Sequence, residues 1–136
     1  MKHLAAIRTN KWTEEEERLL ASLRPQFGDN IAVVFHNRPE GINPPLDVVD
    51  ISDDWVRDAG LKWLDDWGWR CGDYFYYRLR EARPEYDHYW LIEPDVVFSA
   101  DTTGFFDKFE NTEAAALGLR PGAYPNMKHR FAVSLS

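Results

Sequence analysis

The chain has 136 residues and a formal net charge of −7, with 44% hydrophobic and 29% charged residues. This length and composition suit one folded domain over residues 1–136, and the acidic balance disfavours nucleic acid as a partner. No apolar run reaches the roughly 20 residues that cross a bilayer, and the apolar segment at the start is too short for a signal peptide. A single cysteine excludes an internal disulfide framework. We therefore expect a cytoplasmic protein without a membrane span.

The first part of the chain predicts a strand, a helix and a second strand. Residues 4–7 form a short apolar run that is typical of a strand. Thr13, followed three residues later by Glu16, matches a capping box at the start of a helix, and a proline and Gly28 end that helix. Residues 31–35 are continuously apolar and rich in β-branched side chains, which predicts a buried strand.

The next part predicts smaller elements. Residues 46–51 read as a third, shorter strand, and Ser52 offers an N-cap for a brief helix over 54–59. Residues 60–72 carry three tryptophans among glycines and aspartates. We expect a structured loop there rather than a regular element.

The last part predicts a helix, a central strand and a further helix. Asp73 is a candidate N-cap for the first helix, whose buried face repeats at helical spacing: Phe75, Leu79 and Ala82. Residues 88–93 read as a strand buried on both faces, and Asp101 caps the next helix. Residues 111–136 have a weaker pattern, with a strand or helix near 114–119 and a terminal strand near 131–135.

Buried strands alternate with amphipathic helices in this order, which favours an α/β fold: a three-layer, Rossmann-like, mostly parallel sheet. The chain has neither the Gly-x-Gly-x-x-Gly turn nor the P-loop lysine motif. Nicotinamide dehydrogenases and P-loop phosphotransferases are therefore disfavoured.

Two carboxylates follow the central strand. Pro94 cannot donate to a sheet ladder and holds Glu93 extended, so Glu93 and Asp95 leave the carboxyl end of the strand on one side. Ligands bind at this edge of an open α/β sheet. Two such acids can hold Mn²⁺ or Mg²⁺, which in turn holds a diphosphate. The alternative is that Glu93 caps or salt-bridges another group and Asp95 begins a turn.

The same stretch carries a resemblance. Residues 89–96, with the sequence YWLIEPDV, resemble the Tyr-Trp-x-x-Glu-Pro-(Asp/Asn)-Val run of the fungal α-1,2-mannosyltransferases. The chain is more similar still to a group of bacterial glycosyltransferase-like proteins, in which a segment like residues 69–74, WRCGDY, precedes that run. The segment 7–11, IRTNK, also looks like the nucleotide-facing start of those chains.

The resemblance implies a glycosyltransferase of the GT-A type, which binds a nucleotide-sugar donor and transfers the sugar to an acceptor, here unknown. It places Glu93 and Asp95 at a Mn²⁺ or Mg²⁺ ion and the diphosphate. It places Arg8 and Thr9 near the nucleoside, and Asp73 near the nucleotide or the donor sugar. The mannosyltransferases also use a histidine and an acidic group that come much later in their chains. Few residues follow Asp95 here, so the resemblance is compatible with a truncated transferase, a fragment or a minimal donor-binding module.

Several assignments stay open. Trp67 and Trp69 could line an acceptor groove, although a tryptophan is often simply packed in a core. Arg8 could pair with phosphate oxygens in a fork geometry or form a surface salt bridge. A non-catalytic nucleotide-binding or interaction domain is the main alternative function. A metal-dependent phosphohydrolase is a weaker one, since the first strand lacks an Asp-x-Asp.

Overall fold

The computed structural model describes residues 2–98, 102–107, 109, 116–117 and 133–135. Its sheet has the strand order β3-β2-β1-β4-β6-β5, in which the first four strands are parallel and the last two pairings are antiparallel. The strands are β1 (His3–Thr9), β2 (Ile31–His36), β3 (Asp47–Ile51), β4 (His88–Ile92), β5 (Ala116–Leu117) and β6 (Val133–Leu135). The predicted α/β, Rossmann-like, mostly parallel fold is confirmed.

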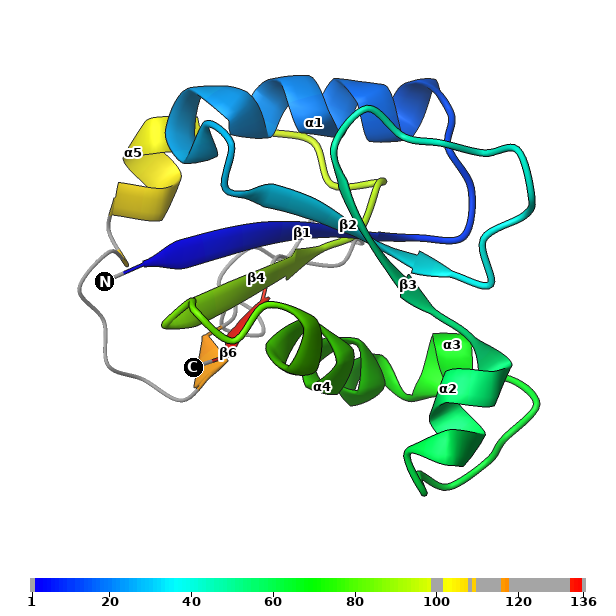
Figure 1. Ribbon diagram of the computed structural model, residues 1–136. Coiled ribbons are helices and arrows are strands. Elements are labelled where there is room, and N and C mark those ends of the chain that lie inside the picture. The colour runs from blue at the N-terminus through cyan, green and yellow to red at the C-terminus, as the bar shows by residue number, and fades with distance from the viewer. Residues whose placement is uncertain (1, 99–101, 108, 110–115, 118–132, 136) are drawn as a thin grey trace, which may run out of the picture.

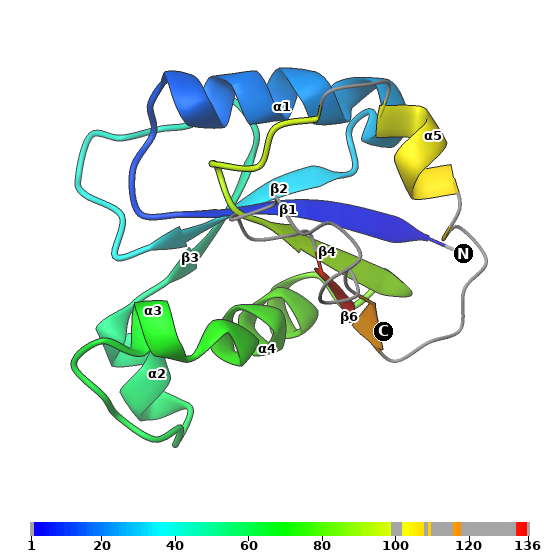
Figure 2. The same ribbon diagram turned by 180° about the vertical axis from the view of Figure 1, so that it is seen from behind.

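Helices cover both faces of this sheet, which makes three layers. Figure 1 shows α1 and α5 above the strands and α4 below them, with α2 and α3 beyond the end of α4. The view from behind shows the same two layers of helices, one on each side of the sheet (Figure 2). The helices are α1 (Glu14–Phe27), α2 (Asp53–Asp58), α3 (Trp67–Arg70), α4 (Gly72–Ala82) and α5 (Thr102–Asp107).

The apolar strands supply two cores, one on each face. Successive side chains of a strand point to opposite faces, and in β1 Ala5 and Ile7 join the core under α1, whereas Leu4 and Ala6 join the core over α4. This division explains why the strands are continuously apolar and do not alternate with polar residues.

The predicted capping box of α1 is confirmed. Thr13 is the N-cap, with its hydroxyl accepting from the Glu15 backbone N–H, and Glu16 Oε2 accepts from the Thr13 N–H at 3.2 Å. Gly28 ends the helix with a φ of +57°, a conformation that glycine adopts at little cost. The turn from β1 into α1 is thus held by side-chain hydrogen bonds.

Other expectations need correction. The segment 60–72 is not all loop, because Trp67–Arg70 forms α3. The N-cap of α4 is Cys71, and Asp73 lies exposed in the first helical turn. The central strand ends at Ile92, one residue earlier than predicted. The predicted cap at Asp101 lies outside the described residues.

The topology places a crevice at one edge of the sheet. From β1 the chain crosses one face through α1 to reach β2, while β4, on the other side of β1, is reached across the opposite face through α4. The strand order therefore reverses between β1 and β4, whose carboxyl ends lie side by side at one edge of the sheet. Such a switch point is where open α/β sheets bind ligands.

Candidate functional site

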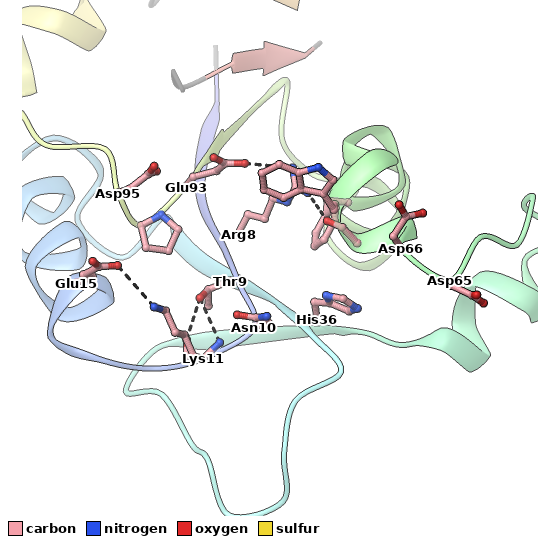
Figure 3. A pocket seen from close by; sticks show the side chains of 14 residues that line it. Arg8, Thr9, Asn10, Lys11, Glu15, His36, Asp65, Asp66, Glu93 and Asp95 are labelled. Atoms are coloured by element: carbon pink, nitrogen blue, oxygen red, sulfur yellow. Dashed lines mark hydrogen bonds and ion pairs between the residues drawn. The ribbon is translucent and has the colours of Figure 1, made fainter. Parts of the chain in front are cut away.

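A cavity of about 490 Å³ lies at this switch point. Figure 3 shows side chains from the ends of β1 and β4, from the start of α1 and from α3 surrounding it. Five of the seven predicted site residues line it, and Trp67 and Asp73 do not. The full lining is Arg8, Thr9, Asn10, Lys11, Glu15, His36, Asp65, Asp66, Gly68, Trp69, Phe75, Glu93, Pro94 and Asp95.

Arg8 is held in place from three sides. Its Nη1 lies 3.4 Å from Glu93 Oε1, its Nη2 donates a hydrogen bond to the Gly68 carbonyl oxygen, and its Cζ lies 4.4 Å from the centre of the Phe75 ring. The side chain is only 16% exposed. A guanidinium fixed in this way forms a preorganised positive group in the cavity.

Glu93 and Asp95 leave β4 together but face different surroundings. The Glu93 side chain is 17% exposed and points toward Arg8 (Figure 3), so the salt-bridge alternative for Glu93 is realised in the structure. Asp95 is exposed and lines the same cavity. Pro94, between them, lies outside the regular strand, as its missing N–H requires.

The two carboxylates are a small ligand set for a metal. Within residues 2–98 and the other described positions, no group of three or more His, Cys, Asp or Glu side chains could hold an ion. Mg²⁺ and similar ions are often bound through one or two carboxylates, with waters and substrate phosphates completing the shell. With only Glu93 and Asp95 as acids, an ion here would take most of its ligands from water and substrate.

Thr9 uses its hydroxyl inside the protein. It is 6% exposed, and its Oγ1 lies 2.9 Å from the Lys11 carbonyl oxygen and 3.1 Å from Glu16 Oε1, with the Lys11 N–H donating to it at 3.3 Å. The residue therefore shapes the turn that leaves β1. Thr9 borders the cavity, but its hydroxyl is committed to these partners.

The start of α1 is unsuited to phosphate. Helix N-termini commonly bind anions through unpaired N–H groups and the helix dipole. Here residues 14–17 are four glutamates, and the capping box occupies the first donors. The cations at the cavity are Arg8 and Lys11, whose Nζ lies 3.8 Å from Glu15. A phosphate in this cavity would therefore contact Arg8 or Lys11.

The two tryptophans of the predicted acceptor groove lie in different environments. Trp67 is fully buried, and its indole N–H donates to Asp53 Oδ1 at 2.8 Å, so its predicted place in a groove is wrong. It packs in the core because α3 turns it inward. Trp69 is 66% exposed and lines the cavity, where its ring offers a stacking face. Asp73 is not part of the lining.

Sequence reasoning missed His36. It is the last residue of β2, and its ring lines the cavity and lies 4.4 Å from the Trp67 ring. Burial lowers the pKa of His36; Asp53 acts in the opposite direction and Arg8 in the same direction as burial. The available signal was its place at the end of a parallel strand, since the carboxyl ends of such strands share one edge.

Asp53 anchors the loop beside this histidine. Hydrogen bonds from Asn37, and then from Trp67, lower the pKa of Asp53.

Gly68 packs closely against the ring of His36. A Cβ at position 68 would lie 2.2 Å from His36 Cε1. A side chain at that position would require the His36 ring or α3 to move.

No protein-family model, curated protein or solved structure matches the chain. Within the described part of the chain, no helix is both long and apolar enough to span a membrane.

Proposed function

We propose that this domain binds a nucleotide-sugar donor in the cavity at the ends of β1 and β4, as a glycosyltransferase of the GT-A type. The observation that carries the proposal is that Arg8, Glu93 and Asp95 line one cavity at the switch point of a Rossmann-like sheet. A cation and two acids at this edge match the needs of a diphosphate and its counter-ion.

Each residue has a separate task in this proposal. The Arg8 guanidinium pairs with phosphate oxygens, and its contacts with Gly68 and Phe75 keep it oriented without a ligand. Glu93 and Asp95 hold Mn²⁺ or Mg²⁺, which when bound stabilises the negative charge that develops on a leaving diphosphate. The exposed face of Trp69 stacks on the base or a sugar at the rim.

A second candidate is a domain that binds the nucleotide without transferring the sugar. It is favoured by the Arg8–Glu93 ion pair, which engages one of the only two acids proposed for the metal. The same residues then recognise the diphosphate, and the metal contributes affinity but no turnover.

A thermal-shift panel of nucleotide sugars, with and without Mn²⁺, tests the proposal on the wild type and on Glu93→Gln and Asp95→Asn. We expect a metal-dependent rise in Tm that both variants lose. Asp29→Asn, an exposed acid far from the cavity, is the control and keeps the rise. An unchanged shift in both site variants rejects the site. Measuring release of the nucleoside diphosphate from the donor then separates transfer or hydrolysis from binding alone.

A further inference from the structure

His36 sits beside an asparagine whose amide orientation is set by unambiguous partners. The Asp53 backbone N–H donates to Asn37 Oδ1 at 3.0 Å, and Asn37 Nδ2 donates to Asp53 Oδ1 at 3.0 Å. A backbone N–H can only donate, and an ionised carboxylate can only accept. The oxygen and nitrogen of the Asn37 amide are therefore assigned by chemistry.

This assignment fixes the protonation of the neighbouring imidazole. Asn37 Nδ2 also lies 3.1 Å from His36 Nε2. Because the amide nitrogen donates, Nε2 must accept and carries no proton, which leaves the proton of the neutral ring on Nδ1. A second proton on His36 would place an N–H against an N–H.

Nδ1 is the ring nitrogen of His36 that makes no hydrogen bond with the described residues, and it is not one of the buried polar atoms left without a partner. The Gly68 backbone packs beside it, since a Cβ at Gly68 would lie 2.5 Å from Nδ1. His36 lines the cavity together with Arg8. The charged groups that face or surround the ring are Asp53 from α2, Arg8 from β1, and Asp65 and Asp66 on the same cavity wall.

We propose that His36 donates a hydrogen bond from Nδ1 to an uncharged oxygen of the bound ligand, and that Asn37 enforces this role by occupying Nε2. The inference rests on the proposed function for the identity of that ligand, a nucleotide sugar. Its acceptor oxygen is a carbonyl of the base or a hydroxyl of a sugar ring. A phosphate would be served better by an imidazolium, which Asn37 opposes, so the diphosphate is left to Arg8. His36 is thereby a specificity residue and not a general base.

The tautomer is measured without any ligand. Long-range proton–nitrogen correlation spectra distinguish protonated from unprotonated ring nitrogens, and the chain has only four histidines, which single variants assign. We expect Nδ1–H with a bare Nε2 for His36 at neutral pH. An Nε2–H tautomer, or a doubly protonated ring, overturns the proposal.

Asn37→Asp replaces the donor by an acceptor of the same shape. Asn37 has a φ of +47°, which aspartate also tolerates, although the new carboxylate faces Asp53 Oδ1, which accepts from Asn37 Nδ2 in the wild type. We expect His36 to gain a proton on Nε2 and the midpoint of its titration to rise by about 1 to 3 pH units. Asn43→Asp makes the same charge change in the same connection and leaves the midpoint unchanged. Equal midpoints in the two variants contradict the role of Asn37.

Ligand titrations test the donation itself. UDP-glucose and GDP-mannose with Mg²⁺ are each compared with their own nucleoside diphosphate, and titration calorimetry reports binding independently. A shift of the His36 Nδ1–H resonance already seen with the nucleoside diphosphate assigns the contact to the nucleoside. A shift seen only with the nucleotide sugar assigns the contact to the sugar. Binding without any shift rejects the donation. If none of the four compounds binds, the proposed function fails and the donation with it, while the tautomer remains established by the ligand-free spectrum.

Discussion

Arg8 Nη1 lies 3.4 Å from Glu93 Oε1; Arg8 is the penultimate residue of β1, and Glu93 directly follows the neighbouring strand β4. Their side chains are 16% and 17% exposed. Ion pairs on the surface contribute little to stability, whereas removing one partner of a sheltered pair leaves the other poorly solvated. This pair therefore serves both the fold and the site.

A double-mutant cycle measures the pair. Arg8→Met and Glu93→Gln should each lower the free energy of unfolding by about 1–3 kcal/mol, since each leaves a partly buried polar group without its partner. The double variant should lose less than the sum, with a coupling of about 0.5–3 kcal/mol. Denaturant unfolding of the four proteins gives these values.

The matched control for this cycle is Arg57 with Asp54. Their side chains are 53% and 90% exposed and the charges lie 3.7 Å apart. We expect their coupling to stay below about 0.5 kcal/mol. A coupling for Arg8 and Glu93 no larger than this control would show that the pair contributes nothing beyond surface attraction.

Removing the N-cap of α1 tests the turn that leaves β1. Thr13→Ala should reduce the free energy of unfolding by about 0.5–2 kcal/mol, because the cap hydroxyl satisfies a helix donor and contacts Glu16 at 2.7 Å. Ser22→Ala, in the middle of the same helix, should change stability far less. Equal losses in the two variants, measured by urea unfolding, would argue against the cap.

Gly68→Ala tests the close approach of α3 to β2. The added methyl group would lie 2.2 Å from His36 Cε1, so the imidazole or α3 must move, at a cost of about 1–3 kcal/mol. Gly104→Ala, where nothing lies within 4 Å, is the control and should be near neutral. A Gly68 variant as stable as the wild type, with the His36 resonances unmoved, would contradict this packing.

The pH dependence of stability follows from His36. Its pKa is lowered on folding, so below pH 6.5 the unfolded chain binds a proton that the folded state resists. The free energy of unfolding should fall as the pH drops from 6.5 toward the folded pKa of His36. Denaturant unfolding of the wild type and His36→Gln measures this free energy between about pH 5 and 7, the range in which histidines commonly titrate. The variant should show a shallower fall, and identical slopes would exclude the contribution of His36.

Local signals in the sequence were sufficient for most of the fold. Buried strands, a capping box and a serine cap depend on neighbouring residues, and β1, β2, α1 and α2 lie where these signals predicted. The short helix α3 carried no such signal, because its four residues are held by packing of Trp67 against the rest of the core. That packing also explains why Trp67 was wrongly expected at a groove.

The candidate site was predictable only in part. Residues next to one another in the chain, such as Glu93 and Asp95, could be placed at a sheet edge from the spacing alone. The Arg8–Glu93 contact spans 85 positions and depends on β1 and β4 being neighbours. The arrangement of His36, Asn37 and Asp53 likewise requires the end of β2 and the start of α2 to meet. Tertiary structure, and not local pattern, brings such groups together.

The central claim is that the diphosphate of a nucleotide sugar binds where Arg8, Glu93 and Asp95 meet. Titration calorimetry of UDP-glucose and GDP-mannose, with and without Mn²⁺, tests it directly on the wild type and on Arg8→Met and Asp95→Asn. We predict metal-dependent binding of one donor to the wild type, with affinity reduced about 10- to 100-fold in each variant. Binding that is equally tight in the wild type and both variants, or that does not depend on the metal, would contradict the account.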